Sequence, residues 1–379
     1  MKVLSKVLWA IDFNSDHEIS IEKINRVRNQ FGNDLIILHV LPPHIKGAAS
    51  QKKITKSVEY EIRNKISARL KPENEQTITV RVEVGDIADQ INKVAKEEKV
   101  NLVILNKGKT AELGANGFNI LRKLRKPVAV LPQSPSGNNQ HLVCPVDNSK
   151  ASAMALKSAI LHARKIDARL SVITVYRPFN LISPRLMRAG LTEENERKRD
   201  YKIFKKEFKT FLRDFDFSNV NAEALILEGD PETEIVKFAQ QATVLYVGSS
   251  GKRALQRSFL GSVSEKVIRE VGCSVVNVKT EDVFRLRIPS GSENLETHYN
   301  SGNELAKLGF MKEAIVQYKH ALKIKNFHLP TIEALVKVYI QLGKKEEARF
   351  YENLKESILT TIMNRTIEHE IRKSYSAAT

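Results

Sequence analysis

The chain has 379 residues, enough for two or three domains, and its 42% hydrophobic and 28% charged residues are ordinary for a globular protein. The net charge of +17 is spread along the chain instead of being gathered on one face or arm, so we do not expect nucleic acid as a partner. No apolar run is long enough to predict a transmembrane helix. Two cysteines give no disulfide framework and no metal-binding spacing, which indicates a cytoplasmic location.

Strand and helix patterns alternate along the first 132 residues. The strand patterns are short apolar runs, such as residues 102–105, that suit a parallel sheet covered by helices on both faces. This alternation predicts a doubly wound α/β domain. The expected strands are 3–12, 34–41, 76–84, 101–106 and 127–132, and the expected helices are 18–31, 51–69, 86–98 and 117–124.

A second α/β pattern follows the polar, glycine-bearing residues 134–140, which predict a linker. Its sequence repeats the first: residues 10–15 match 145–149, residues 35–40 match 170–175, and residues 84–86 match 228–230. We therefore expect two copies of one domain. The strands of the second copy are expected over 141–147, 169–176, 221–228, 243–248 and 273–279, and its helices over 149–166, 192–214, 231–241 and 262–271.

A segment of small residues lies where the fourth strand of the second copy meets the next helix. Glycines at such a junction let the backbone approach a bulky anion, because they carry no Cβ atom. The N-terminus of the helix adds unpaired N–H groups and a partial positive charge. The segment therefore predicts a phosphate-binding loop. Its small residues are Gly248, Gly251, Gly261 and Ser262.

The spacing of these glycines differs from two common phosphate-binding motifs. A P-loop has the pattern G-x-x-x-x-G-K-[ST], and the nearest match has Val103 where the first glycine should stand. A dinucleotide-binding fold has G-x-G-x-x-G after its first strand, whereas these glycines follow a late strand. The alternative interpretation is a loop before a helix that Ser262 and Glu265 close with a capping box. The candidate phosphate contacts inside the loop are Lys252, Arg253 and Arg257.

Because of these repeated motifs and this glycine spacing, both copies resemble universal stress protein domains. The second copy carries that family's nucleotide motif, G-x2-G-x9-G-S, from Gly248 to Ser262. The resemblance implies two Rossmann-like folds of the adenine nucleotide alpha hydrolase type. It also implies bound ATP, dimerisation through the last strand region, a role in stress survival and regulation, and slow or absent ATP hydrolysis. We expect a degenerate domain over 1–137 and a domain with the intact ATP motif over 140–282.

The resemblance also assigns individual contacts in the second copy. Asp147 would lie near adenine and ribose, although it could also cap the helix that starts near Ser149. Val175 would meet adenine through its backbone, although a valine there also suits a strand core. The phosphates would lie at the glycine segment, with any Mg²⁺ held by ATP and not by protein side chains. The implied nucleotide-binding residues are Asp147, Val175, Gly248, Gly251, Gly261, Ser262 and Val263.

The first copy departs from this motif. Asn106 stands opposite Gly248, Gly114 stands opposite Gly261, and Ala115 replaces the serine. The loop is also five residues shorter, 21 against 26, between Asn106 and Pro127. We predict that this copy binds ATP much more weakly or not at all, and that it pairs with the second copy as an intramolecular pseudo-dimer.

No catalytic constellation stands out in the sequence. The nine histidines form no HExxH pattern, and no G-x-S-x-G elbow is present. The carboxylates nearest the loop, Asp230 and Glu265, are explained as helix caps. Three interpretations stay open: a nucleotide-regulated binding module, a slow Mg²⁺-dependent ATPase, and a nucleotide-free protein-interaction scaffold.

The C-terminal part, residues 295–379 after a linker over 286–297, has a different pattern. Residues 306–309 return as 340–343, which is a period of 34 residues. This part resembles tetratricopeptide repeats, with a plain helical hairpin as the alternative, and predicts a small all-α region. We expect its helices to pack on the α/β body or on a second chain, because the repeats are too few to be stable alone, and to bind a protein partner. Helix 354–375 would be a capping or interaction helix. The signature residues are Gly302, Leu305, Gly309, Ala314, Tyr318 and Ala321, then Tyr339, Gly343 and Ala348, with Glu352 where an aromatic is usual.

Overall fold

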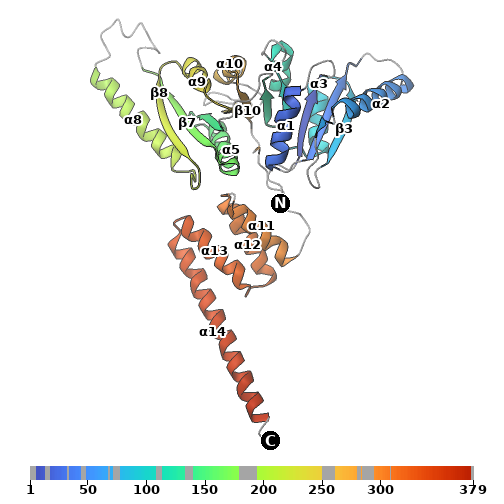
Figure 1. The fold of residues 1–379 in the computed structure, drawn as a ribbon. Coiled ribbons are helices and arrows are strands. Elements are labelled where there is room, and N and C mark those ends of the chain that lie inside the picture. Colours follow the sequence, from blue (N-terminus) through green and yellow to red (C-terminus); the bar gives the residue numbers. More distant parts are fainter. Residues whose placement is uncertain are drawn as a thin grey trace. The chain divides into compact units, whose positions relative to one another are not determined.

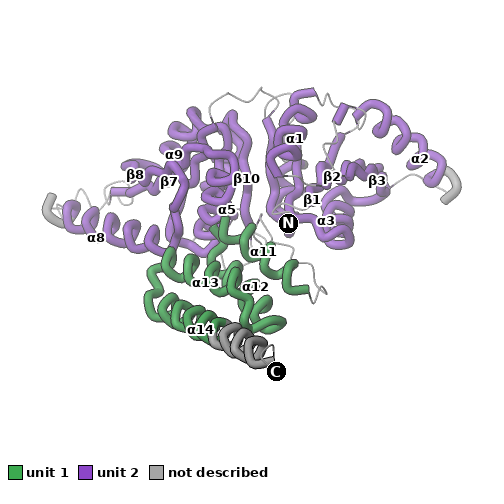
Figure 2. The backbone as a smooth tube through the Cα atoms, turned by 60° about the horizontal axis from the view of Figure 1, so that its bottom comes forward, with its two compact units in different colours: residues 1, 288–379 green, residues 2–287 purple. Residues whose placement is uncertain are grey.

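The computed structural model divides the chain into two compact units (Figure 2). Residues 2–287, purple in the figure, form the α/β unit, and residues 288–379, green in the figure, form the C-terminal unit. Each unit is treated separately below. The structure describes residues 6–12, 18–31, 34–43, 48–66, 69–70, 77–107, 113–132, 140–178, 194–249, 261–279, 283, 294–307 and 309–376.

The α/β unit is built on one sheet of ten strands in the order β3-β2-β1-β4-β5-β10-β9-β6-β7-β8. Each half has the same strand order, and the two halves meet at β5 and β10, as the ribbon in Figure 1 shows. The strands of the first copy are β1 (Lys6–Ile11), β2 (Asp34–Leu41), β3 (Ile78–Val84), β4 (Leu102–Asn106) and β5 (Val128–Leu131). Those of the second are β6 (His141–Pro145), β7 (Arg169–Tyr176), β8 (Ala222–Glu228), β9 (Val244–Gly248) and β10 (Ser274–Val278).

Helices follow the strands in both copies, so the predicted doubly wound α/β fold is confirmed. The first copy has α1 (Glu18–Phe31), α2 (Ala48–Lys65), α3 (Ile87–Glu97) and α4 (Gly114–Lys123). The second has α5 (Lys150–Ile166), α8 (Glu194–Leu212), α9 (Pro231–Ala239) and α10 (Ser262–Glu270). The main differences from the expected bounds are in α2, which spans Ala48–Lys65 and not 51–69, and in α4, which begins at Gly114 and not at residue 117.

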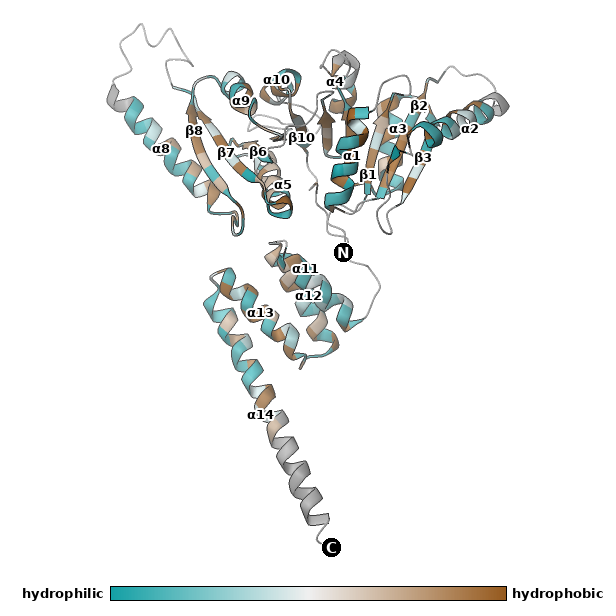
Figure 3. Ribbon diagram, viewed as in Figure 1, coloured by the Kyte–Doolittle hydropathy of each residue, from teal (hydrophilic) through white to brown (hydrophobic). Residues whose placement is uncertain are grey.

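Apolar strands account for the core, and Figure 3 shows the hydrophobic residues concentrated along them. All four residues of β5 and the first four of β4 are buried, as expected for strands covered on both faces. Helix α3 shows how a helix joins this core: Ile91, Val94 and Ala95 lie on one face and are buried. Asp86 starts that helix by accepting a hydrogen bond from the backbone N–H of Asp89 at 3.1 Å.

The two copies meet through an antiparallel pairing of β5 with β10, while the other neighbouring strands in the sheet run parallel. Two buried lysines cross this junction in opposite directions. Lys279, which follows β10, donates from Nζ to the carbonyls of Leu121 (2.7 Å) and Leu124 at the end of α4. Lys107, which follows β4, donates to the carbonyl of Val271 at 2.7 Å, at the end of α10. Each ammonium therefore caps the negative end of a helix in the other copy.

The C-terminal unit consists of α11 (Leu295–Lys307), α12 (Met311–Ile324), α13 (Leu329–Gln341) and α14 (Lys345–Ser376). Gly302 lets α11 approach α12 closely, because a Cβ atom there would lie 2.6 Å from Cδ1 of Tyr318. Gly309 and Gly343 adopt positive φ angles of 78° and 69° in the turns between helices. The expected helix over 354–375 is not separate, because α14 runs without a break from Lys345.

Candidate functional site

The candidate site lies at the carboxyl ends of two neighbouring strands, β6 and β9. In the register of the sheet, Val143 of β6 pairs with Ser171 of β7 on one side and Leu245 of β9 on the other. The strand order therefore reverses its direction at this point. Ligands of doubly wound folds bind in the crevice outside the carboxyl ends of strands at such a switch point. Asp147 follows β6 and Gly248 ends β9, so the sequence places its predicted residues on both sides of this crevice.

Gly248 lies against the start of α5. A Cβ atom at this position would lie 2.6 Å from the carbonyl carbon of Ala151 and 2.7 Å from the backbone nitrogen of Ser152. These are backbone atoms, which cannot move aside as a flexible side chain can. From the sequence, we expect Gly248 to let the backbone approach a bound anion. The structure gives a further reason for it, the close approach of helix α5.

The loop between β9 and α10 is tied at both ends. The backbone N–H of Ser249 donates to the carbonyl of Val278 at 3.0 Å, and the N–H of Gly261 donates to the carbonyl of Ser249 at 3.0 Å. The hydroxyl of Ser264 donates to the carbonyl of Gly248 at 2.8 Å, which fixes α10 to the end of β9. Four of the predicted site residues lie between these ties and outside the described residues: Gly251, Lys252, Arg253 and Arg257.

No side chain in the described part of the chain caps helix α10. Its N-cap is Gly261, with φ −63° and ψ 151°, and Ser262 is the exposed first residue of the helix. The predicted Ser262–Glu265 capping box is therefore wrong, because Ser262 lies one position too late to act as the N-cap. The carboxylate of Glu265 turns to the first copy, where Arg122 donates to its two oxygens at 2.7 and 2.6 Å. The first N–H groups of α10 have no intrahelical acceptor, and this end of the helix favours an anion.

Asp147 orders the turn that leads into α5. Its Oδ1 accepts a hydrogen bond from the backbone N–H of Ser149 at 3.1 Å, and its side chain is otherwise exposed. The helix itself is capped by Ser149, whose hydroxyl accepts from the N–H of Ser152 at 3.2 Å. The alternative that Asp147 caps α5 is therefore wrong. The carboxylate fixes the bend of the chain beside the crevice instead.

Two predicted residues contribute their side chains to the core. Val175 lies near the end of β7 and Val263 lies in the first turn of α10, and both are partly buried against the central apolar cluster. Next to Val175, the hydroxyl of Thr174 donates to the carbonyl of Val146 at 2.9 Å, which ties β7 to the chain leaving β6.

Comparison with known proteins decides the family. The family model described as the universal stress protein family matches this chain twice, over residues 4–132 and 138–279. The chain belongs to the universal stress protein family. A universal stress protein of Methanocaldococcus jannaschii is 34% identical over 144 residues, which is 36% of this chain and 81% of that protein.

Solved structures agree on the fold of the paired domains. A universal stress protein from Archaeoglobus fulgidus has a TM-score of 0.52 and 19% identity, and it covers 72% of this chain and 96% of its own. A functionally unknown protein from Pseudomonas aeruginosa has a TM-score of 0.53 and 16% identity, with 74% and 94% covered. A further universal stress protein has been solved in complex with cAMP; it is 24% identical, covers 38% of this chain and 98% of its own, and has a TM-score of 0.26.

The first universal stress protein domain has a different junction at the equivalent place. Asn106 stands at the end of β4, and its Oδ1 accepts a hydrogen bond from Nε1 of the buried Trp9 at 3.4 Å. The link from β1 to α1 runs from residue 12 to 17, whereas the link from β6 to α5 is only residues 146–149. Helix α4 begins at Gly114 after an N-cap, Leu113, that makes no side-chain hydrogen bond. The side chain of Ala115 lies outside the described residues.

Asp230 of the second domain caps α9, as predicted. Its Oδ2 accepts a hydrogen bond from the N–H of Thr233 at 3.4 Å, and Pro231 occupies the first turn.

Among the described residues of the whole chain, His, Cys, Asp and Glu side chains form no group of three or more that could hold a metal ion. None of the helices searched in that part of the chain is long and apolar enough to cross a membrane.

The sequence did not reveal the contacts between the two domains. Arg122 belongs to a segment that looks like a solvated helix face, Lys107 follows an expected strand, and Lys279 ends one. Each of the three finds its partner more than 140 residues away. Arg269 of α10 adds a cation–π contact, 4.6 Å from the ring centroid of Phe118 in α4. The only available signal was the repeat itself, which implies that two copies of one domain meet.

Proposed function

We propose that the second universal stress protein domain binds ATP and that the protein is a nucleotide-regulated binding module of the stress response. One observation carries the proposal. The N-terminus of α10 begins at a glycine, lacks a described capping side chain, and lies next to the switch point between β6 and β9. Such a helix end binds phosphate through its free N–H groups and its dipole. The G-x2-G-x9-G-S motif supports the same assignment.

In this proposal the nucleotide lies across the crevice. The phosphates face Gly261 and Ser262, where the exposed hydroxyl of Ser262 and the first N–H groups of α10 donate hydrogen bonds. Adenine and ribose lie between Asp147 and the backbone at Val175. Lys252, Arg253 and Arg257 supply positive charge from the loop. Mg²⁺, when present, is bound by the phosphate oxygens.

A substitution at Gly261 tests the site without weakening the helix. Aspartate is a favourable N-cap, so Gly261→Asp should keep or raise the stability of α10. The same carboxylate would repel a triphosphate, so we expect ATP affinity in calorimetry to fall at least tenfold, about 1.4 kcal/mol. The matched control is Gly114→Asp, which places a carboxylate at the equivalent helix of the first domain and should leave ATP affinity unchanged. Equal ATP affinity in all three proteins would falsify the assignment.

We further propose that the C-terminal unit is tetratricopeptide-like and passes the nucleotide state to a protein partner. The two helical hairpins and the close approach at Gly302 support this part. Side chains available to a partner include Phe327, Ile340 and Phe350, which are 55%, 59% and 62% exposed. If ATP regulates the C-terminal unit, ATP should change the rate of amide hydrogen exchange in residues 295–361 of the wild-type protein. An unchanged exchange pattern at saturating ATP would limit the function to nucleotide binding alone.

A further inference from the structure

A cavity of about 430 Å³ lies between the two universal stress protein domains, away from the proposed ATP site. Helix α1 of the first domain and α5 of the second form its walls, and β4, β5, β10 and β9 form its floor. In the second domain it is lined by Gln140, Leu142 and Thr243, at the amino ends of β6 and β9, whereas Asp147 and Gly248 lie at the carboxyl ends. Its volume is within the range of small-molecule sites, about 300–1,000 Å³.

The floor of the cavity is apolar. Because successive side chains of a strand point to opposite faces, Ala129 and Val276 face the cavity, while their neighbours Val130 and Val275 belong to the core under α4 and α10. The other aliphatic residues that line the cavity include Val27, Leu102, Ile104, Leu131, Leu142 and Val244.

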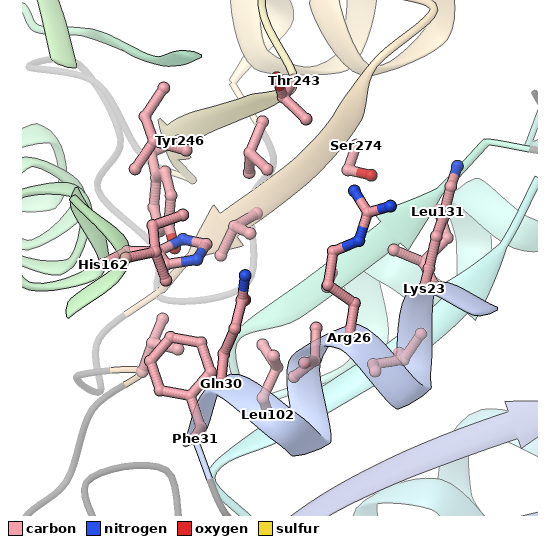
Figure 4. A pocket seen from close by; sticks show the side chains of 18 of the residues that line it. Lys23, Arg26, Gln30, Phe31, Leu102, Leu131, His162, Thr243, Tyr246 and Ser274 are labelled. Carbon is pink, nitrogen blue, oxygen red and sulfur yellow. The ribbon is translucent and has the colours of Figure 1, made fainter. Parts of the chain in front are cut away.

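One end of the cavity is aromatic and uncharged (Figure 4). The ring of Phe31 lies 5.2 Å from that of His162, and Nδ1 of His162 lies 2.7 Å from the hydroxyl of Tyr246. Burial lowers the pKa of His162 to about 4, so the ring is neutral at physiological pH. This end therefore offers an apolar surface with no net charge.

The other end carries positive charge. Lys23 and Arg26 extend from α1. The buried ammonium of Lys23 donates to the carbonyl of Pro132 at 2.8 Å, and burial lowers its pKa to about 8, so it still carries its charge at neutral pH. Figure 4 shows the guanidinium of Arg26 directed toward Ser274 of β10. Arg26 pairs with Glu22 at 3.3 Å, but both side chains are well exposed (44% and 67%), and such pairs hold their partners weakly. No Asp or Glu is among the described residues that line the cavity. Arg26 can therefore turn from Glu22 to an anion within the cavity.

We propose that this cavity binds a small amphipathic carboxylate, with its apolar chain along the floor and its carboxylate at Arg26 and Lys23. The apolar floor and the cationic end correspond to the two parts of such a ligand. A guanidinium suits a carboxylate because it donates two parallel hydrogen bonds. A neutral lipid with the same apolar chain would contact the floor of the cavity but would gain no binding energy from the two cations.

Decanoate and 1-decanol are the probes that separate the two contributions. Calorimetric titration of the full chain should give tighter binding of decanoate than of 1-decanol. Arg26→Gln should weaken decanoate binding about tenfold, because it removes the charge-assisted hydrogen bonds to the carboxylate, and should change the affinity for 1-decanol by no more than about twofold. The matched control is Arg63→Gln on α2, because Arg63 makes the same kind of exposed i,i+4 pair with Glu59 but lies outside the cavity.

A second variant tests the place of binding. Ala129→Leu fills space above the floor, so it should weaken both probes at least tenfold while Arg63→Gln weakens neither. Thermal unfolding of each variant checks that it remains folded. If Ala129→Leu does not fold, Arg26→Gln still tests whether the charge of Arg26 contributes to decanoate binding. The proposal is overturned if the wild type binds neither probe, if Arg26→Gln leaves decanoate affinity unchanged, or if a folded Ala129→Leu binds both probes normally.

Discussion

Arg122 in α4 and Glu265 in α10 form an ion pair that joins the two domains, with Nη2 of Arg122 donating to both carboxylate oxygens at 2.7 and 2.6 Å. The side chains are 44% and 23% exposed, so solvent screens the pair only in part. Glu265 lies in the first turn of α10, where a negative charge is also favoured by the helix dipole. The pair therefore connects the helix of the proposed ATP site to the other domain.

This pair should contribute modestly to stability. A double-mutant cycle with Arg122→Gln and Glu265→Gln, measured by urea unfolding, should give a coupling energy of about 0.5–1 kcal/mol at low salt. The coupling should shrink in 1 M salt, because screening is nearly complete there. The pair Arg63–Glu59 within α2 is the control and should couple by no more than about 0.5 kcal/mol. Equal coupling energies for the two pairs would show that the contact between domains adds nothing beyond a surface pair.

Glu265 also shows where sequence reasoning fails. The alternation of apolar strands and helices predicted the paired α/β domains because burial on both faces leaves a clear local pattern. The capping box failed because Gly261, one residue earlier, already had the extended backbone of an N-cap, and a backbone conformation is not visible in side-chain types. The ion pair of Glu265 could not be predicted from the sequence, because Arg122 lies 143 positions away and looks like a solvent-exposed helix residue.

Lys279 gives the folded protein a pH dependence. Burial lowers the pKa of its ammonium from 10.5 to about 8, although it donates to the carbonyls of Leu121 and Leu124. Between these two pKa values the unfolded chain holds a proton that the folded chain has released. The free energy of unfolding therefore rises with pH through this window, and the cost of burying the charge is fully present below pH 8.

The comparison that isolates this effect is wild type against Lys279→Met. Urea unfolding at each pH gives the free energy of unfolding of both proteins. The difference, wild type minus Lys279→Met, should rise by about 2 kcal/mol from pH 7 to pH 10. The exposed Lys65 is the matched control, and Lys65→Met should show little such change. A difference between wild type and Lys279→Met that stays flat across this range would mean that the folded-state pKa is not depressed.

Gly302 should control the stability of the C-terminal unit. A methyl group there would press on the ring of Tyr318, and that ring is held in place because its hydroxyl donates to Oδ1 of Asn303 at 2.8 Å. Gly302→Ala should therefore separate α11 from α12 and cost about 1–3 kcal/mol, the usual cost of overpacking. Hydrogen exchange should speed up over residues 295–324 and remain unchanged over β4 and β9, which belong to the other unit. Slower exchange in α11 would mean that helix propensity outweighs the crowding.

Gly248 allows packing to be separated from ligand binding. A Cβ atom there would meet backbone atoms of Ala151 and Ser152 at 2.6 and 2.7 Å, so Gly248→Ala must displace either the end of β9 or the start of α5. We expect a loss of about 2–3 kcal/mol in nucleotide-free protein, because overpacking against backbone cannot be relieved by a change of rotamer. The matched control is Gly272→Ala in the same domain, where the added Cβ would meet nothing within 4 Å, and which should be neutral.

The outcome for Gly248 bears on how the motif is understood. If Gly248→Ala is unstable without nucleotide while Gly261→Asp is stable and loses ATP, the two glycines serve different purposes. The first then permits α5 to lie close to β9, which sets the width of the crevice, and the second leaves the end of α10 open to phosphate. If Gly248→Ala instead unfolds like the wild type and only loses ATP affinity, α5 has room to move, and the glycine is required by the ligand alone. Urea unfolding and calorimetry on the same three proteins distinguish these cases.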